Sequence, residues 1–225
     1  MDTQSLYTAL VFVHILLFVA WLGGDIGVFI LGQHFRKRHT YALETRLHFL
    51  KLLVLNDMAP RTAWALMVPV SLTMTALGGW AAMPGWIIDV SWAVGLVWVA
   101  LVWWIYAAGR SARAGFLKRI QFALAMILCA FYAGLAAAGF SGLWEAPFWL
   151  ALKALLFALI FAAAIMIDVA YKPVGPRLAR LIEEGSSDET EKPLLAAMNV
   201  TRRWVLALYA LLLLVGAVGT FKPVF

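Results

Sequence analysis

Two residues that can ligate a metal, His14 and Lys153, lie inside strongly apolar stretches of this chain. An ionisable side chain inside a bilayer costs roughly 3 kcal/mol, so it is usually paired, hydrated or bound to a ligand. A neutral imidazole is a common ligand of haem iron, and a deprotonated lysine amine can occupy the opposite axial position. These residues permit a haem site. They equally permit a hydrogen-bonded histidine and a lysine that reaches the lipid headgroups.

A second polar set consists of Asp25, Asp57 and Arg61. Asp57 and Arg61 are four residues apart, so their side chains can pair on one helix face. Asp25 is expected at a similar depth. We interpret the three either as a structural link between two helices or as catalytic groups that carry protons or hold a polar substrate or quinone headgroup.

The segments that carry these residues are typical of a membrane protein. The chain has 225 residues, of which 64% are apolar and 13% charged, whereas soluble domains contain roughly a quarter charged residues. We predict one all-α integral membrane domain over residues 1–225, a polytopic bundle in contact with the lipid bilayer. Six spans are predicted, the second interrupted by Asn56, Asp57 and Pro60: residues 6–31, 52–80, 90–108, 116–139, 148–171 and 204–221.

The distribution of Lys and Arg predicts the orientation. The loops after the first, third and fifth spans are basic, whereas the other two loops contain no Lys or Arg. The positive-inside rule therefore places these three loops in the cytoplasm and both termini outside, as in a multi-pass protein of a bacterial inner (plasma) membrane. The net charge of +6 belongs to these loops and does not indicate nucleic-acid binding. Residues 183–192 are expected to form a mobile cytoplasmic linker.

This orientation brings the two metal-binding residues to a common depth. The first and fifth predicted spans both begin outside, so His14 and Lys153 are both expected in the outer half of the membrane. At 100° per residue, Phe18, Trp21 and Asp25 share one helix face with His14. Asp25 follows His14 by 11 residues, about 16 Å deeper at 1.5 Å per residue. Phe18 and Trp21 are accordingly predicted to contact a flat cofactor.

Three stretches resemble HemJ-type protoporphyrinogen oxidases. The first is His14, six residues, then Trp-Leu-Gly-Gly at 21–24, with His34 further on. The second is Arg46-Leu47 followed by Met-Ala-Pro at 58–60, and the third is the run FWLALKALL at 148–156, which contains Lys153. The resemblance implies a haem b cofactor, with His14 on the iron and Lys153 as the second haem-associated residue. HemJ-type chains are four-helix proteins, so two predicted spans here have no counterpart.

Three functions follow from these observations. The first is a haem b oxidoreductase that passes electrons from a small organic or porphyrinogen-like substrate to a quinone or the respiratory chain. The alternative is a copper or other metal transporter resembling CopD-like proteins, since Met and His suit copper, although the eight Met residues form no close ladder. The third is a structural subunit, which leaves the polar residues unexplained. A homo-oligomer is compatible with each.

Overall fold

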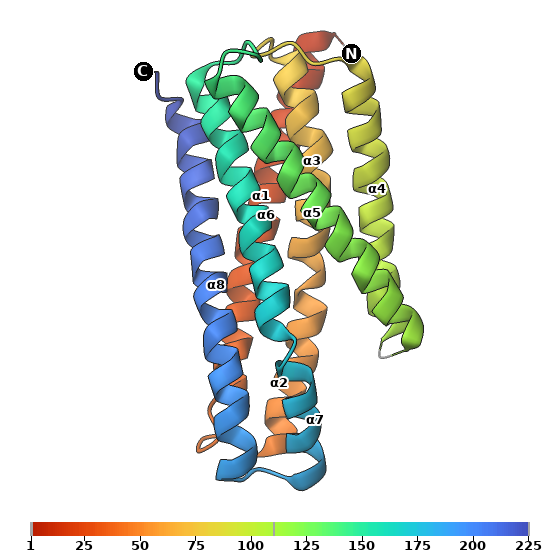
Figure 1. The fold of residues 1–225 in the computed structure, drawn as a ribbon, viewed down its shortest axis with the longest axis vertical. Coiled ribbons are helices and arrows are strands. Elements are labelled where there is room, and N and C mark those ends of the chain that lie inside the picture. The colour runs from red at the N-terminus through yellow and green to blue at the C-terminus, as the bar shows by residue number, and fades with distance from the viewer. Residues whose placement is uncertain (1, 110, 225) are drawn as a thin grey trace.

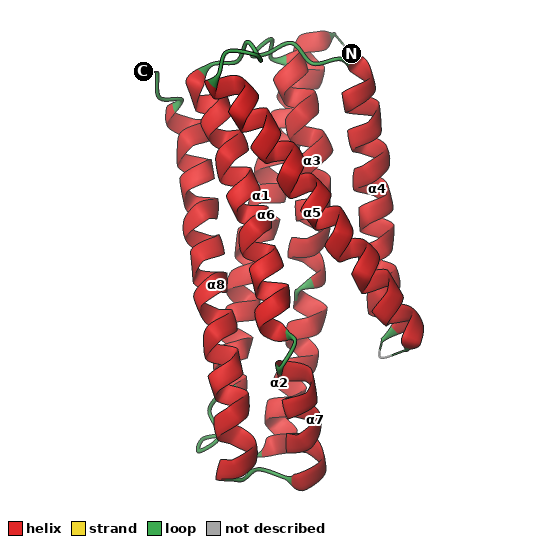
Figure 2. Cartoon of the chain, in the orientation of Figure 1, coloured by secondary structure: helices red, strands yellow, loops and turns green. Residues whose placement is uncertain are grey.

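The computed structural model describes residues 2–109 and 111–224, and throughout this part of the chain the regular secondary structure is entirely α-helical (Figures 1 and 2). The all-α prediction is confirmed. The eight helices of the described residues are α1 (Thr3–Phe35), α2 (Leu43–Asn56), α3 (Met58–Leu77), α4 (Gly85–Ala108), α5 (Ala112–Phe140), α6 (Phe148–Tyr171), α7 (Val174–Glu184) and α8 (Asp188–Phe221).

Five helical segments are long and apolar enough to cross a membrane, and they coincide with five of the six predicted spans. They are Thr3–Phe35, Gly85–Ala108, Ala112–Phe140, Phe148–Glu184 and Asp188–Phe221. The remaining predicted span, 52–80, covers the end of α2 and all of α3. The two helices meet at Asp57, within the polar interruption of the span. Helix α3 is not among the five. Its Trp64 packs against rings of α1, α4 and α6, and a helix enclosed in this way has less need of an apolar surface.

The helices form one long bundle with a shorter hairpin beside it. Helices α1, α2–α3, α6–α7 and α8 run along the bundle, and the α4–α5 hairpin lies against it with α5 crossing diagonally (Figure 1). Both termini lie at one end of the bundle, which we call the terminal end. The predicted even number of passes requires this arrangement. Helix α1 has 33 residues and is therefore about 50 Å long, which exceeds a hydrocarbon core of about 30 Å.

The ends of α1, α2, α7 and α8 that lie away from the termini continue past the adjoining ends of α4 and α5 (Figure 1) and form a region that we call the extension. Its core contains Phe35, Leu181 and Leu194. A fully buried ion pair lies beside this core. Arg46 Nη1 and Nη2 donate to the two carboxylate oxygens of Glu191 at 2.5 and 2.9 Å, and Arg46 Nε donates to the carbonyl of Phe35 at 2.6 Å.

The predicted linker at 183–192 is wrong in its extent. Helix α7 continues to Glu184, and α8 begins at Asp188, so only residues 185–187 separate them. Gly185 provides the turn with φ 82°, and Ser187 and Thr190 form a reciprocal capping box at the start of α8. The segment is polar because it caps a helix and because Glu191 pairs with a distant arginine. The local sequence does not reveal that partner.

Candidate functional site

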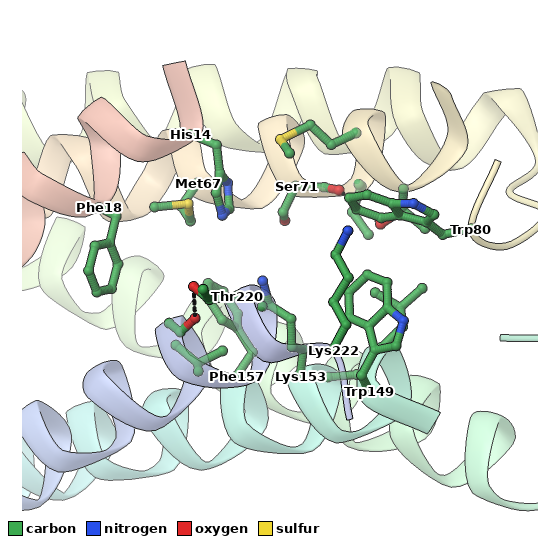
Figure 3. Close-up of a pocket in the computed structure, with 18 of the residues that line it drawn as sticks. His14, Phe18, Met67, Ser71, Trp80, Trp149, Lys153, Phe157, Thr220 and Lys222 are labelled. Carbon is green, nitrogen blue, oxygen red and sulfur yellow. Dashed lines mark hydrogen bonds between the residues drawn. The ribbon is translucent and has the colours of Figure 1, made fainter. Parts of the chain in front are cut away.

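A cavity of about 570 Å³ lies near the terminal end of the bundle, between α1, α3, α6 and α8 (Figure 3). Its volume falls within the usual range of small-molecule and cofactor pockets. All four residues predicted to bind the cofactor line it: His14, Phe18, Trp21 and Lys153. The structure thus brings the three residues of α1 together with Lys153 of α6, which lies more than 130 positions further along the sequence.

His14 projects from α1 into this cavity, with Phe18 and Met67 nearby (Figure 3). Its Nδ1 atom is buried and has no hydrogen-bond partner in the described structure. Leaving a buried polar atom without a partner costs about 1–3 kcal/mol, so such atoms in folded proteins usually have a ligand or water. Metal ligation would satisfy this nitrogen, or a hydrogen bond would do so while Nε2 faced a ligand.

Lys153 enters the same cavity from α6, and its amine points toward the side of His14 (Figure 3). Gly219 of α8 makes room for it: a Cβ at this position would lie 2.7 Å from Lys153 Nζ. A second lysine, Lys222, lies at the cavity with its ammonium 4.7 Å from the ring centroid of Trp80. No Asp or Glu is among the described residues that line the cavity, so the side chains there that can carry a charge near pH 7 are basic.

An aromatic cluster extends from the cavity toward the middle of the bundle. Trp21 stacks on Trp64 with ring centroids 5.4 Å apart, and Trp64 packs edge-on against Trp98 at 4.9 Å. Phe157 and Tyr132, both of which line the cavity, also contact this cluster through Phe161. The cluster gives the cavity a rigid, apolar inner wall, suited to a flat hydrophobic ligand.

The three residues predicted to be catalytic lie outside the cavity. Asp57 and Arg61 form the expected ion pair, with Arg61 Nε 2.5 Å from Asp57 Oδ2, at the junction of α2 and α3. The charge of Asp25 interacts with both of these residues. Tyr209 Oη of α8 donates to the backbone carbonyl of Asp25 at 2.5 Å, and Asn56 Nδ2 donates to that of Gly24 at 2.7 Å. The predicted residues therefore form two groups, a cavity set and an acidic set.

Two residues of these groups were not predicted. Asp168 of α6 lies within electrostatic range of Asp57 and Arg61, which makes it a third carboxylate of the acidic set. Asp168 is the other residue of the predicted span 148–171 that carries a formal charge at pH 7, and a charge within this apolar stretch could have indicated it. Lys222 lies at the end of the last predicted span, where a lysine normally indicates only a membrane boundary. Its proximity to the cavity depends on packing that the sequence does not reveal.

No protein-family model, curated protein or solved structure matches this chain. The site is therefore interpreted from its own residues.

Proposed function

We propose that this protein is a haem b-binding membrane oxidoreductase, with the cofactor in the cavity between α1 and α6. The observation that carries the proposal is the buried, unpartnered Nδ1 of His14 in an aromatic-walled cavity that also contains Lys153. Histidine is the commonest protein ligand of haem iron, and haem is a flat, largely apolar group. When bound, haem would supply one-electron redox chemistry at its iron.

Each cavity residue has a specific role in this proposal. His14 would hold the haem iron and Lys153 would be the second haem-associated residue, since both side chains project into one cavity from different helices. Trp21, Phe18 and Phe157 line the cavity and would pack against the apolar body of the haem and exclude water. Trp64 fixes the orientation of Trp21 by stacking on it.

The acidic set is proposed to carry protons between the interior of the bundle and the end opposite the termini, where the predicted basic loops lie. Asp25, Asp57 and Asp168 come from α1, the α2–α3 junction and α6, and Arg61 offsets part of their negative charge. Carboxylates and basic groups at membrane depth often relay protons. A quinone or respiratory-chain component of a bacterial inner membrane is the proposed acceptor, and a small organic or porphyrinogen-like molecule the proposed substrate.

Copper transport is the second candidate, because Met67 and Met74 line the cavity together with His14. Thioether and imidazole groups are good ligands for copper. Electrostatics favours haem, however. Lys153 and Lys222 lie in the same cavity with no carboxylate among its described lining residues, so a passing cation would be repelled. An occupant with acidic groups would be attracted.

The test is an absorption spectrum of the purified protein, oxidised and reduced, with a pyridine haemochrome assay and metal analysis. We expect a Soret band that is lost in His14→Ala and retained in His48→Ala, because His48 is an exposed histidine of α2 outside the cavity. Lys153→Met should retain haem with altered Soret and visible bands. A colourless wild-type protein that takes up no haem would remove the proposal, and stoichiometric copper would favour the second candidate.

A further inference from the structure

The backbone of Lys222 adopts an unusual conformation. It caps the end of α8 with φ 44° and ψ 58°, and it is the only non-glycine residue in the described parts of the chain with a positive φ. Glycine is the usual residue in this left-handed position, because a side chain there is strained. Strain of this kind often occurs at functional sites, where the side chain compensates for the backbone cost.

The side chain of Lys222 is held at the terminal end of the cavity by two indoles. Its Nζ lies 4.7 Å from the ring centroid of Trp80 and 5.4 Å from that of Trp149. These two rings pack edge-to-face with centroids 5.0 Å apart. Cation–π contacts restrict the position of the ammonium but leave its hydrogen-bond donors available. Among the described residues, none forms an ion pair with Lys222.

The surroundings make an anion the natural partner of this ammonium. Lys153 projects into the same cavity, and in the haem-free protein the positive charges of the two lysines oppose each other. The cavity offers no carboxylate from its described lining residues to relieve this repulsion. An anion from the occupant would relieve it and would form a charge-assisted hydrogen bond.

We propose that Lys222 binds a carboxylate of the cavity occupant, so that the acidic end of the occupant faces the terminal end of the bundle. Its apolar body then lies against Phe18, Trp21 and Phe157. This inference rests on the proposed function for the identity of the occupant, a porphyrin whose ring carries two carboxylic acid side chains. Lys222 selects the free acid, whereas His14 ligates the metal, so the two roles can be separated.

The experiment measures binding of metal-free protoporphyrin and of its dimethyl ester to the purified haem-free protein, by quenching of tryptophan fluorescence. Neither probe requires metal ligation by His14. We expect the wild-type chain to bind the free acid about tenfold more tightly than the ester. Lys222→Gln should weaken binding of the acid about tenfold and leave binding of the ester unchanged, and Lys222→Arg should retain the preference.

Two further variants exclude indirect effects. Lys222→Gly removes the ammonium but suits the left-handed backbone, so it should lose the preference without loss of stability. Lys172→Gln is the matched control, because the Lys172 ammonium also lies over a ring, that of Phe122 at 6.0 Å, yet the residue does not line the cavity. It should keep the wild-type preference.

The outcomes separate this inference from the proposed function. Equal binding of the acid and the ester, or an acid preference that persists in Lys222→Gln, overturns the role of Lys222 even if the protein contains haem. A protein without haem that still prefers the free acid through Lys222 supports this role and contradicts iron ligation by His14. Failure to bind either porphyrin overturns the role of Lys222, and it overturns the proposed function as well when the purified protein also takes up no haem.

Discussion

The extension and the cavity differ in how their ionisable side chains are satisfied: the buried ion pair of the extension has its partners within the protein, whereas His14 in the cavity has a buried nitrogen without one. In the extension, Arg46 donates three hydrogen bonds, and Glu191 accepts from Arg46 and from Ser186 Oγ. In the cavity, His14 Nδ1 and Tyr132 Oη are buried and have no hydrogen-bond partner among the described residues, and the exposed ammonium of Lys222 at the cavity's terminal end forms no ion pair with them. Buried polar groups whose hydrogen bonds are made within the protein help to specify its fold. Buried polar groups without a partner are typical of a binding site.

The largest effect on stability is expected from breaking the buried ion pair of Arg46 and Glu191. Glu191→Gln leaves Arg46 buried with an uncompensated charge and should lower the free energy of unfolding by about 3–5 kcal/mol. Equilibrium unfolding in detergent micelles measures this change. The double variant Arg46→Met with Glu191→Leu should recover most of the stability, since neither charge then remains buried. A loss in the double variant as large as in Glu191→Gln would show that the charge balance is not the cause.

A smaller effect of opposite sign is expected in the cavity. His14→Leu removes an unpartnered buried nitrogen and should raise the free energy of unfolding of the haem-free protein by about 1 kcal/mol. The matched control is His34→Leu, because His34 Nδ1 lies 3.0 Å from Tyr41 Oη. This control should lose about 1 kcal/mol. A destabilised His14→Leu protein would mean that this imidazole has a structural role.

The smallest effect is expected at the partly exposed pair of Asp57 and Arg61. Its side chains are 23% and 43% exposed, so Arg61→Gln should change the free energy of unfolding by less than about 1 kcal/mol. Asp57→Asn should have a similar effect, and the double-mutant cycle gives the coupling between them. A coupling as large as that of Arg46 and Glu191 would show that Asp57 and Arg61 are a structural ion pair. Such a result would weaken their proposed role in proton transfer.

The membrane-crossing helices could be predicted because their cause is local. An apolar stretch that is long enough to cross a bilayer is visible in the sequence, so the predicted span 148–171 coincides with α6. Counting spans predicted a common depth for His14 and Lys153, and in the structure both residues line one cavity. Hydropathy and chain direction together predicted this part of the site.

Features that depend on distant contacts were not predictable. Arg46 belongs to a predicted basic loop and Glu191 to a predicted linker, and nothing near either residue in the sequence indicates the other. For the same reason residues 183–192 resembled a linker. Lys222 and Asp168 were missed because their roles depend on the helices that lie next to them. Single-sequence patterns describe the environment of a segment but not its neighbours.

The ion pair between Arg46 and Glu191 has a consequence for biosynthesis. The two residues are separated by 145 positions, and α3 to α7 are synthesised between them. Arg46 of the nascent chain therefore has no Glu191 to pair with until α1 to α7 have been synthesised. Because domains complete their packing only when the last contributing segment is present, α8 acts as the closing element of assembly. A chain truncated before Glu191 would expose an unpaired arginine and an apolar surface, the features by which quality control recognises unfinished proteins.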